Sequence, residues 1–164
     1  MVLGMSLATF TRLHVLISLV GIVSGFIVMA GLLAGNRMRV STAIFLVTTV
    51  LTSATGFLFP FHGLEPPHIV GIISLVVLAI AILARYAFHL AGRWRSTYVI
   101  TSVIALYFNV FVLVVQSFQK VAALRALAPH QNEPPFVVTQ LVVLALFVVL
   151  GVFATGKFRR AVMA

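Results

Sequence analysis

The chain has 164 residues, of which 62% are hydrophobic and 8% are charged, and this composition excludes an ordinary soluble globular domain. Its net charge of +9 does not indicate nucleic-acid binding, because the basic residues flank apolar runs instead of gathering on one polar face with aromatic side chains. The chain contains no cysteine, which excludes disulfides, thiolate metal sites and thiol redox chemistry.

Apolar runs dominate the sequence. A hydrocarbon core of about 30 Å takes roughly 20 helical residues to cross. The runs that are long enough cover residues 13–34, 41–60, 68–91, 98–118 and 136–156. The sequence therefore predicts an all-α polytopic integral membrane protein. We expect a single membrane domain, residues 1–164, built as a five-transmembrane-helix bundle.

The first run, 13–34, is expected to remain in the mature protein as a helix. It is too long for the apolar core of a signal peptide, and most nearby basic residues follow it, which is the wrong polarity for a signal. His14 lies about one turn into this run, where an ionisable side chain marks a candidate site. The alternative is a hydrogen-bonded or headgroup-level histidine. The sequence GIVSG at 21–25 offers a Gly-x-x-x-Gly surface for packing inside the monomer or between copies.

The second run, 41–60, is rich in hydroxyl side chains. These are Thr48, Thr49, Thr52, Ser53 and Thr55. Such residues commonly make interhelical or same-helix hydrogen bonds, although we also take Thr52 as a candidate ligand contact. An alternative with four spans would make this run a re-entrant segment.

The second and third runs are joined by FHGLEPPH at 61–68, which contains one of the two acidic residues of the chain. Glu65 with two prolines after it suits the start of a helix, because a first-turn proline loses no hydrogen bond and a carboxylate favours the positive end of the helix dipole. This explanation does not account for His62, three residues before the glutamate, or for His68 on the first turn of the third span.

The fourth run becomes more polar toward its C-terminal end. Asn109 lies near its middle and suits packing between helices, whereas Gln116 and Lys120 lie near its end and are candidate ligand contacts.

The sequence PHQNEPPF at 129–136 then repeats the earlier pattern with a shift of 68 residues. His130 again stands three residues before an acid, Glu133, close enough in a turn for the imidazole to contact the carboxylate. All of these polar residues are predicted to lie toward one face of the membrane.

The basic residues set the expected orientation. With five spans, one side collects Arg37, Arg39, Arg85, Arg93, Arg95, Lys157, Arg159 and Arg160, and the other collects Arg12, Lys120 and Arg125. The positive-inside rule therefore predicts an external N-terminus and a cytoplasmic C-terminus. The expected location is the bacterial inner (plasma) membrane.

The outer polar residues suggest a binding or redox site. His14 and His68 could serve as the two axial ligands of a haem b, with His62 able to replace either one. A transition-metal site is a second option, with His62, His68 and His130 joined by a carboxylate as the ligands.

A quinone or lipid site is a third option. In it a histidine and Gln116 would hydrogen-bond the carbonyl groups of the ligand, within an aromatic wall of Phe108, Phe111 and Phe118.

A different class of function is equally compatible with the sequence. The chain could be a non-catalytic accessory or assembly subunit of a larger membrane complex, in contact with the lipid bilayer, with a membrane-protein partner or with a second copy of itself. A transporter is less well supported, since no span carries a mid-membrane charge or a clear Gly/Pro interruption. No hydrolase or nucleotide motif occurs, so the sequence supports no hydrolytic enzyme and leaves other catalysis open.

Overall fold

The computed structural model describes residues 2–59 and 66–161, without the side chains of residues 66–67 and 159–161. His62 and Glu65 lie outside this described part. The elements are α1 (Leu7–Leu33), α2 (Arg39–Gly56), α3 (Pro66–Ile82), η1 (Leu83–Ala87), α4 (Trp94–Lys120), α5 (Ala122–Leu127) and α6 (Pro134–Ala161). The described part is entirely helical apart from its connections, as the sequence predicts.

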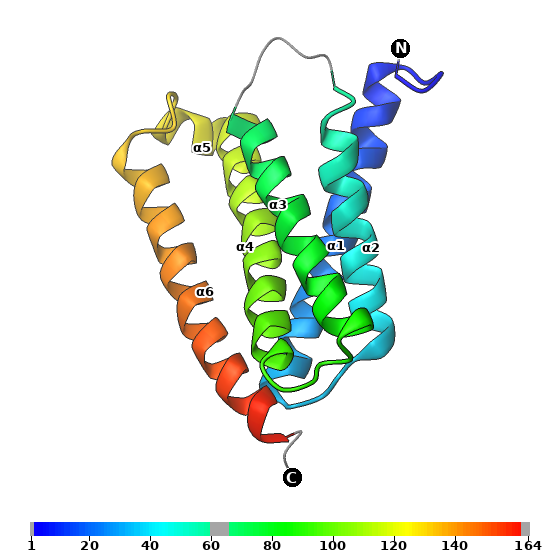
Figure 1. The fold of residues 1–164 in the computed structure, drawn as a ribbon. Coiled ribbons are helices and arrows are strands. Elements are labelled where there is room, and N and C mark those ends of the chain that lie inside the picture. The colour runs from blue at the N-terminus through cyan, green and yellow to red at the C-terminus, as the bar shows by residue number, and fades with distance from the viewer. Residues whose placement is uncertain (1, 60–65, 162–164) are drawn as a thin grey trace.

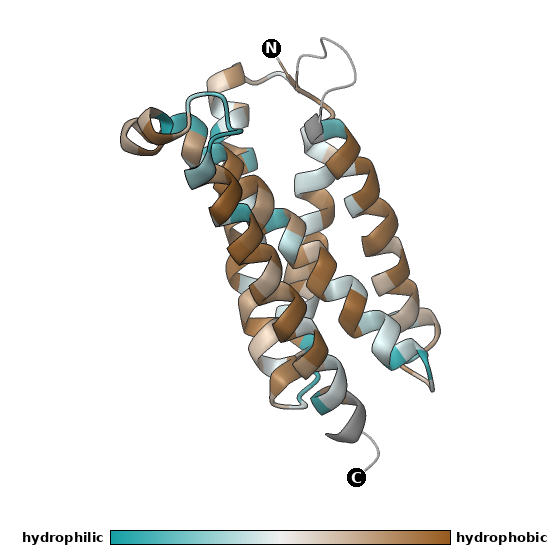
Figure 2. Ribbon diagram, turned by 90° about the vertical axis from the view of Figure 1, so that its left-hand side faces the viewer, coloured by the Kyte–Doolittle hydropathy of each residue, from teal (hydrophilic) through white to brown (hydrophobic). Residues whose placement is uncertain are grey.

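The long helices lie side by side and alternate in direction along one axis (Figure 1). α1, α3 and α6 begin at the end of the bundle where α2 and α4 finish, which we call the N-end; the opposite end is the C-end. The short helix α5 lies across the N-end between α4 and α6. The two chain termini lie at opposite ends, and apolar residues dominate the middle of the helices while hydrophilic residues gather near both ends (Figure 2).

Within the described residues, four helices are long and apolar enough to cross a membrane: Leu7–Leu33, His68–Ala87, Trp94–Lys120 and Pro134–Phe158. They confirm four of the predicted runs. α2 covers most of the remaining run and is one continuous helix of 18 residues, about 27 Å long. Its hydroxyl side chains and Arg39 lower its hydropathy, and it is not among these four helices. α2 runs in one direction throughout Arg39–Gly56, and that it crosses the membrane stays a prediction.

The ends of the predicted spans differ from the observed helices for local reasons. α1 begins six residues before the predicted span because the Ser6 side chain caps it, accepting a hydrogen bond from the Thr9 N–H at 3.1 Å. The sequence predicts that the third span continues to residue 91, but its last helical turn, η1, ends at Ala87. His89 and Leu90 then adopt positive φ angles of 50° and 60°, which cannot continue a right-handed helix.

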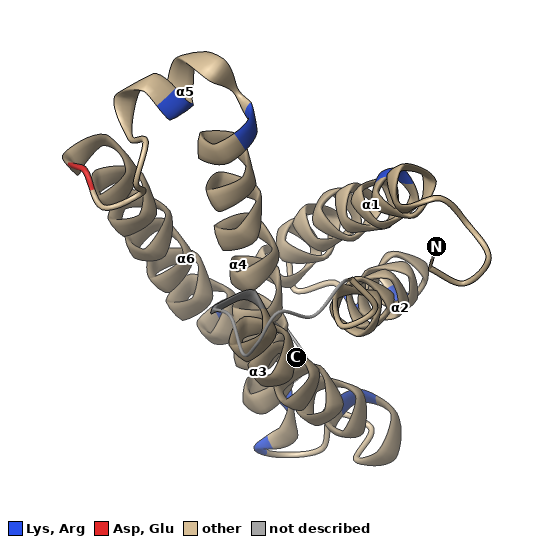
Figure 3. Ribbon diagram, turned by 90° about the horizontal axis from the view of Figure 1, so that it is seen from above, with Lys and Arg blue, Asp and Glu red and all other residues tan. Residues whose placement is uncertain are grey.

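The hydrophobic core lies mainly in the half of the bundle toward the C-end. Its buried side chains come from the end of α1, the start of α2, the end of α3 with η1, the first half of α4 and the second half of α6, including Val28, Phe45, Leu78, Tyr98, Leu106 and Phe158. Toward the N-end, α6 diverges from α1 and α2 (Figures 1 and 3). The described polar residues of the predicted site therefore lie mainly outside this core, toward the N-end.

The Gly-x-x-x-Gly surface of α1 packs inside the monomer. A Cβ atom on Gly25 would lie 2.5 Å from Leu106 Cδ1 and 3.0 Å from the ring of Phe45. A Cβ atom on Gly21 would lie 3.1 Å from Thr48 Oγ1 and 3.3 Å from Thr49 Oγ1. The two glycines thus allow α1 to approach both α2 and α4 closely.

Candidate functional site

His14 is held by a hydrogen bond to α2. Its Nδ1 lies 2.8 Å from Thr55 Oγ1, and the Thr55 hydroxyl lies 2.6 Å from the carbonyl oxygen of Leu51. Because a hydroxyl has a single hydrogen, which Thr55 donates to that carbonyl, Thr55 must accept its second bond from Nδ1–H of His14. This arrangement fixes the imidazole tautomer. The lone pair on Nε2 remains as a hydrogen-bond acceptor or a ligand atom.

Two further hydroxyls continue from this contact toward the middle of the bundle. Thr49, Thr52 and Thr55 recur every three residues along α2 and span about 9 Å. The Thr52 hydroxyl oxygen is buried and has no hydrogen-bond partner within the part of the chain that the structure describes, whereas Thr49 Oγ1 accepts a bond of 3.1 Å from Asn109 Nδ2 on α4. We call His14, Thr49, Thr52, Thr55 and Asn109 the polar seam; it joins α1, α2 and α4.

Two sequence-predicted residues of α4 lie on the same face as Asn109. Gln116 and Lys120 follow it at spacings of seven and four residues, which place all three on one side of a helix. Gln116 is half-buried, and Lys120 is exposed at the last residue of α4, near enough to His14 for its charge to act on the imidazole. The positive charge of Lys120 therefore lies near the N-end of the polar seam.

His68 lies at the start of α3, where its ring centroid is 5.9 Å from that of Phe57. The ring of His14 instead contacts Phe59, with 5.2 Å between ring centroids in an edge-to-face arrangement. α2 packs against both α1 and α3, so these two histidines contact different aromatic side chains at the end of the helix between them. The haem b axial pair of His14 and His68 stays a prediction.

His130 and Glu133 form the imidazole–carboxylate contact that their spacing predicts, with 3.1 Å between Nδ1 and Oε1. The same carboxylate accepts hydrogen bonds from the backbone N–H groups of His130 and Asn132, and the Glu133 carbonyl accepts the first hydrogen bonds of α6. Loss of surrounding solvent raises the pKa of Glu133, but these hydrogen bonds outweigh it, so its pKa lies below the ordinary value of 4.5. Glu133 thus shapes the turn before α6.

The second copy of the repeat lies away from the polar seam. Figure 3 shows the acidic residue of the described chain at the start of α6, across the N-end from α1 and α2. The His130 side chain is 80% exposed.

Among the described residues, no three histidine, aspartate or glutamate side chains are grouped closely enough to hold a metal ion. His62 and Glu65, the central members of the first copy, lie outside the described residues. The predicted site of His62, His68 and His130 therefore stays a prediction.

The predicted aromatic wall faces α6 more than it faces His14. Phe118 packs edge-to-face against Phe136 of α6, with 5.4 Å between ring centroids, and Phe111 packs with Tyr107, whose ring also contacts Phe147 of α6. An aromatic side chain that does contact His14 is Phe59, which follows α2.

Two important residues do not stand out in the sequence. Thr55, which fixes the tautomer of His14, is one hydroxyl among several, and only the register between α1 and α2 distinguishes it. Arg85 reads as a basic residue at a helix end, although its side chain is buried. Comparisons with protein-family models, with curated proteins and with solved structures find no match.

Proposed function

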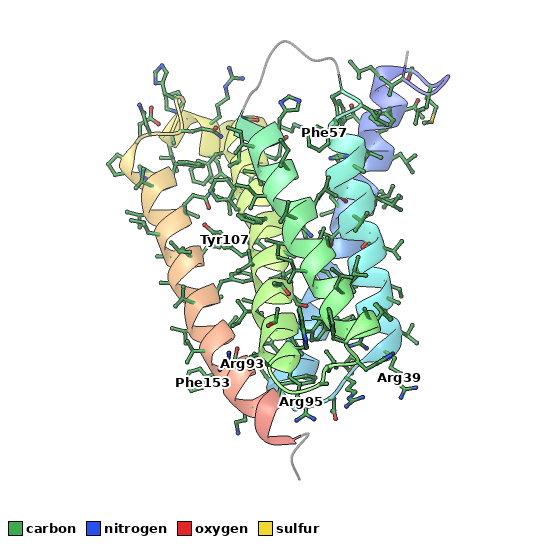
Figure 4. The ribbon with its side chains drawn as sticks, viewed as in Figure 1. Arg39, Phe57, Arg93, Arg95, Tyr107 and Phe153 are labelled. Atoms are coloured by element: carbon green, nitrogen blue, oxygen red, sulfur yellow. The ribbon has the colours of Figure 1, made fainter. Side chains whose placement is uncertain are left out.

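We propose that α2 also crosses the membrane, which brings the number of spans to five, and that the N-end faces the outside of a bacterial inner membrane. The alternating directions of the long helices support this arrangement, as does the length of α2. Arg39, Arg93 and Arg95 all lie at the C-end (Figure 4), where the positive-inside rule favours them on the cytoplasmic side.

We propose further that the chain is a quinone-binding membrane subunit whose polar seam holds the ligand headgroup. The observation that carries the proposal is the fixed tautomer of His14, which leaves Nε2 to accept a hydrogen bond from a quinol hydroxyl. The buried, unpaired hydroxyl of Thr52 is available to donate to a carbonyl oxygen of the oxidised form. Lys120 adds a positive charge that favours electron-rich carbonyl oxygen.

The chemistry of the polar seam favours a neutral, oxygen-bearing ligand over a metal cation. Of the five residues that make it up, one is a histidine and the others are neutral hydroxyls or an amide. The charge that acts on His14 is that of Lys120, which is positive and disfavours a cation. A quinone reaches such a site from the lipid phase, its apolar tail staying among the exposed apolar side chains of the helices.

A binding titration tests this proposal. The purified full chain in detergent is titrated with a short-chain ubiquinone analogue, and the shift in thermal unfolding is measured for the wild type, His14→Ala and His89→Asn. Loss of the His14 hydrogen bond should weaken binding roughly tenfold. His89→Asn is the matched control, because it removes an imidazole near the C-end and asparagine tolerates the positive φ of that position. Equal affinity in all three proteins would contradict the proposal.

The exposed apolar surface of α6 favours a second candidate function, that of an accessory subunit. Only 6% of the most apolar stretch of this helix is buried, and α4 and α6 border an apolar groove of about 510 Å³. Gly156 lies in the groove, and a Cβ atom added to it would meet no heavy atom within 4 Å, so a helix of a partner could approach closely there. Gly156→Leu should then release a partner that co-purifies with the wild type after mild solubilisation; retention of that partner would count against this role.

A further inference from the structure

Arg85 is a buried cation, and only one of its two Nη groups makes a hydrogen bond to the described residues. It lies in the π-helical turn η1, and 8% of its surface is exposed. Its Nη2 donates a hydrogen bond of 3.0 Å to the carbonyl oxygen of Arg37, but its Nη1 is buried and has no hydrogen-bond partner among the described residues. Both Nη nitrogens of a guanidinium are hydrogen-bond donors, and leaving a buried donor unpaired is costly.

The surroundings of Arg85 compensate its charge only in part. The guanidinium carbon lies 5.2 Å from the ring centroid of Tyr98 and 5.8 Å from that of Tyr86, which gives cation–π contacts. The one acidic side chain of the described residues, Glu133, lies at the other end of the bundle. Among those residues, therefore, no carboxylate neutralises Arg85.

A second positive feature adjoins Arg85. The carbonyl that Nη2 contacts belongs to the residue two positions before α2, and α2 begins after Met38, which has a φ of 39° and makes no side-chain capping bond. The first N–H groups of a helix point outward at the positive end of its dipole. A negatively charged group would therefore stabilise both the buried Arg85 guanidinium and the uncapped N-terminus of α2, a helix of 18 residues.

We propose that Arg85 Nη1 and the first turn of α2 bind a phosphate group, supplied by the headgroup of an anionic phospholipid. Phosphate offers several acceptor oxygens, enough for a guanidinium and for helix N–H groups at once. Arg39, Arg93 and Arg95 lie at the same end of the bundle (Figure 4) and attract an anionic headgroup to it. This end of the spans lies at headgroup depth, where the phosphates of lipids are.

The test uses the purified full chain with defined probes. Binding of phosphatidylglycerol, phosphatidylcholine and inorganic phosphate is measured by native mass spectrometry and by the shift in thermal unfolding. The variants are Arg85→Gln and Arg39→Gln, with Arg125→Gln as the matched control, since Arg125 lies on α5 at the N-end. Arg39 is exposed, so its replacement keeps the test available if Arg85→Gln does not fold.

We expect the wild type and Arg125→Gln to bind phosphatidylglycerol equally and more tightly than phosphatidylcholine. Arg85→Gln should bind it roughly ten- to a hundred-fold more weakly, and Arg39→Gln several-fold more weakly. If inorganic phosphate stabilises the wild type but not these variants, and phosphatidylglycerol has no effect, the site binds free phosphate. This result would overturn the proposal that a lipid supplies the phosphate group. The proposal would be overturned if Arg39→Gln binds every probe as tightly as Arg125→Gln does, and if Arg85→Gln, where it folds, does so as well.

Discussion

Replacing Gly25 by alanine places a methyl group where three helices meet. The new Cβ would lie 2.5 Å from Leu106 Cδ1 and 3.0 Å from Cδ2 and Cε2 of Phe45, whereas carbon atoms in contact are normally about 3.5–4.0 Å apart. Both neighbours are only 1% exposed, so neither can relieve the contact by moving out into solvent. Overpacking of this kind costs about 1–3 kcal/mol.

Gly156→Ala is the matched control for this substitution. Among the described atoms, a Cβ at Gly156 meets no heavy atom within 4 Å. Both substitutions gain about the same helix propensity, roughly 1 kcal/mol, so the difference between the two variants isolates the cost of the contact. We therefore expect Gly25→Ala to be about 1–3 kcal/mol less stable than Gly156→Ala.

The assay is reversible unfolding in mixed micelles, with sodium dodecyl sulfate as the denaturant. The fluorescence of Trp94, the single tryptophan, which packs against the core, follows the transition. Equal unfolding free energies for Gly25→Ala and Gly156→Ala would refute the close approach of α1 to α2 and α4. The placement of the polar seam would then lose its basis, because the same packing sets the register between these helices.

The remaining predictions concern the turn before α6 and the topology. Because folding lowers the pKa of Glu133, its contribution to stability is complete above pH of about 4.5 and is lost as the pH falls through the lower pKa of the folded state. The thermal unfolding temperature of Glu133→Gln should therefore differ most from that of the wild type near neutral pH. A difference that grows on acidification would contradict this prediction. The chain has no cysteine, so Asn132→Cys should react with a membrane-impermeant maleimide in intact cells and Ala91→Cys only after lysis. The reverse pattern would show that α2 does not cross or that the orientation is inverted.

Periodic and compositional signals predict the helices well. Long apolar runs need no tertiary information to be recognised as membrane-spanning candidates, because the bilayer thickness alone sets their length. The contact between His130 and Glu133 is also predictable, since residues three apart meet in a turn. Ser6, which begins α1 earlier than expected, has the chemistry of an N-cap, but it precedes the apolar run and gives no periodic signal.

The assembly of the candidate site depends on information that the local sequence lacks. The hydrogen bond between His14 and Thr55 joins residues 41 positions apart and depends on the register of α1 against α2. The burial of Arg85 depends on the π-helical turn η1, which inserts an extra residue per turn and so changes the face on which the side chain lies. Both features follow from helix packing, and the basic residues around Arg85 make it resemble an ordinary lipid-facing cation.

The most direct test of quinone binding at the polar seam is to identify what the protein carries from the membrane. Wild-type protein and His14→Ala are purified in mild detergent, extracted with organic solvent and analysed for quinones, and a visible spectrum is recorded before extraction. The account predicts quinone at near one equivalent in the wild type, much less in His14→Ala, and no haem absorption. A wild-type extract without quinone, equal quinone in both proteins, or a haem absorption band that disappears with His14 would contradict it.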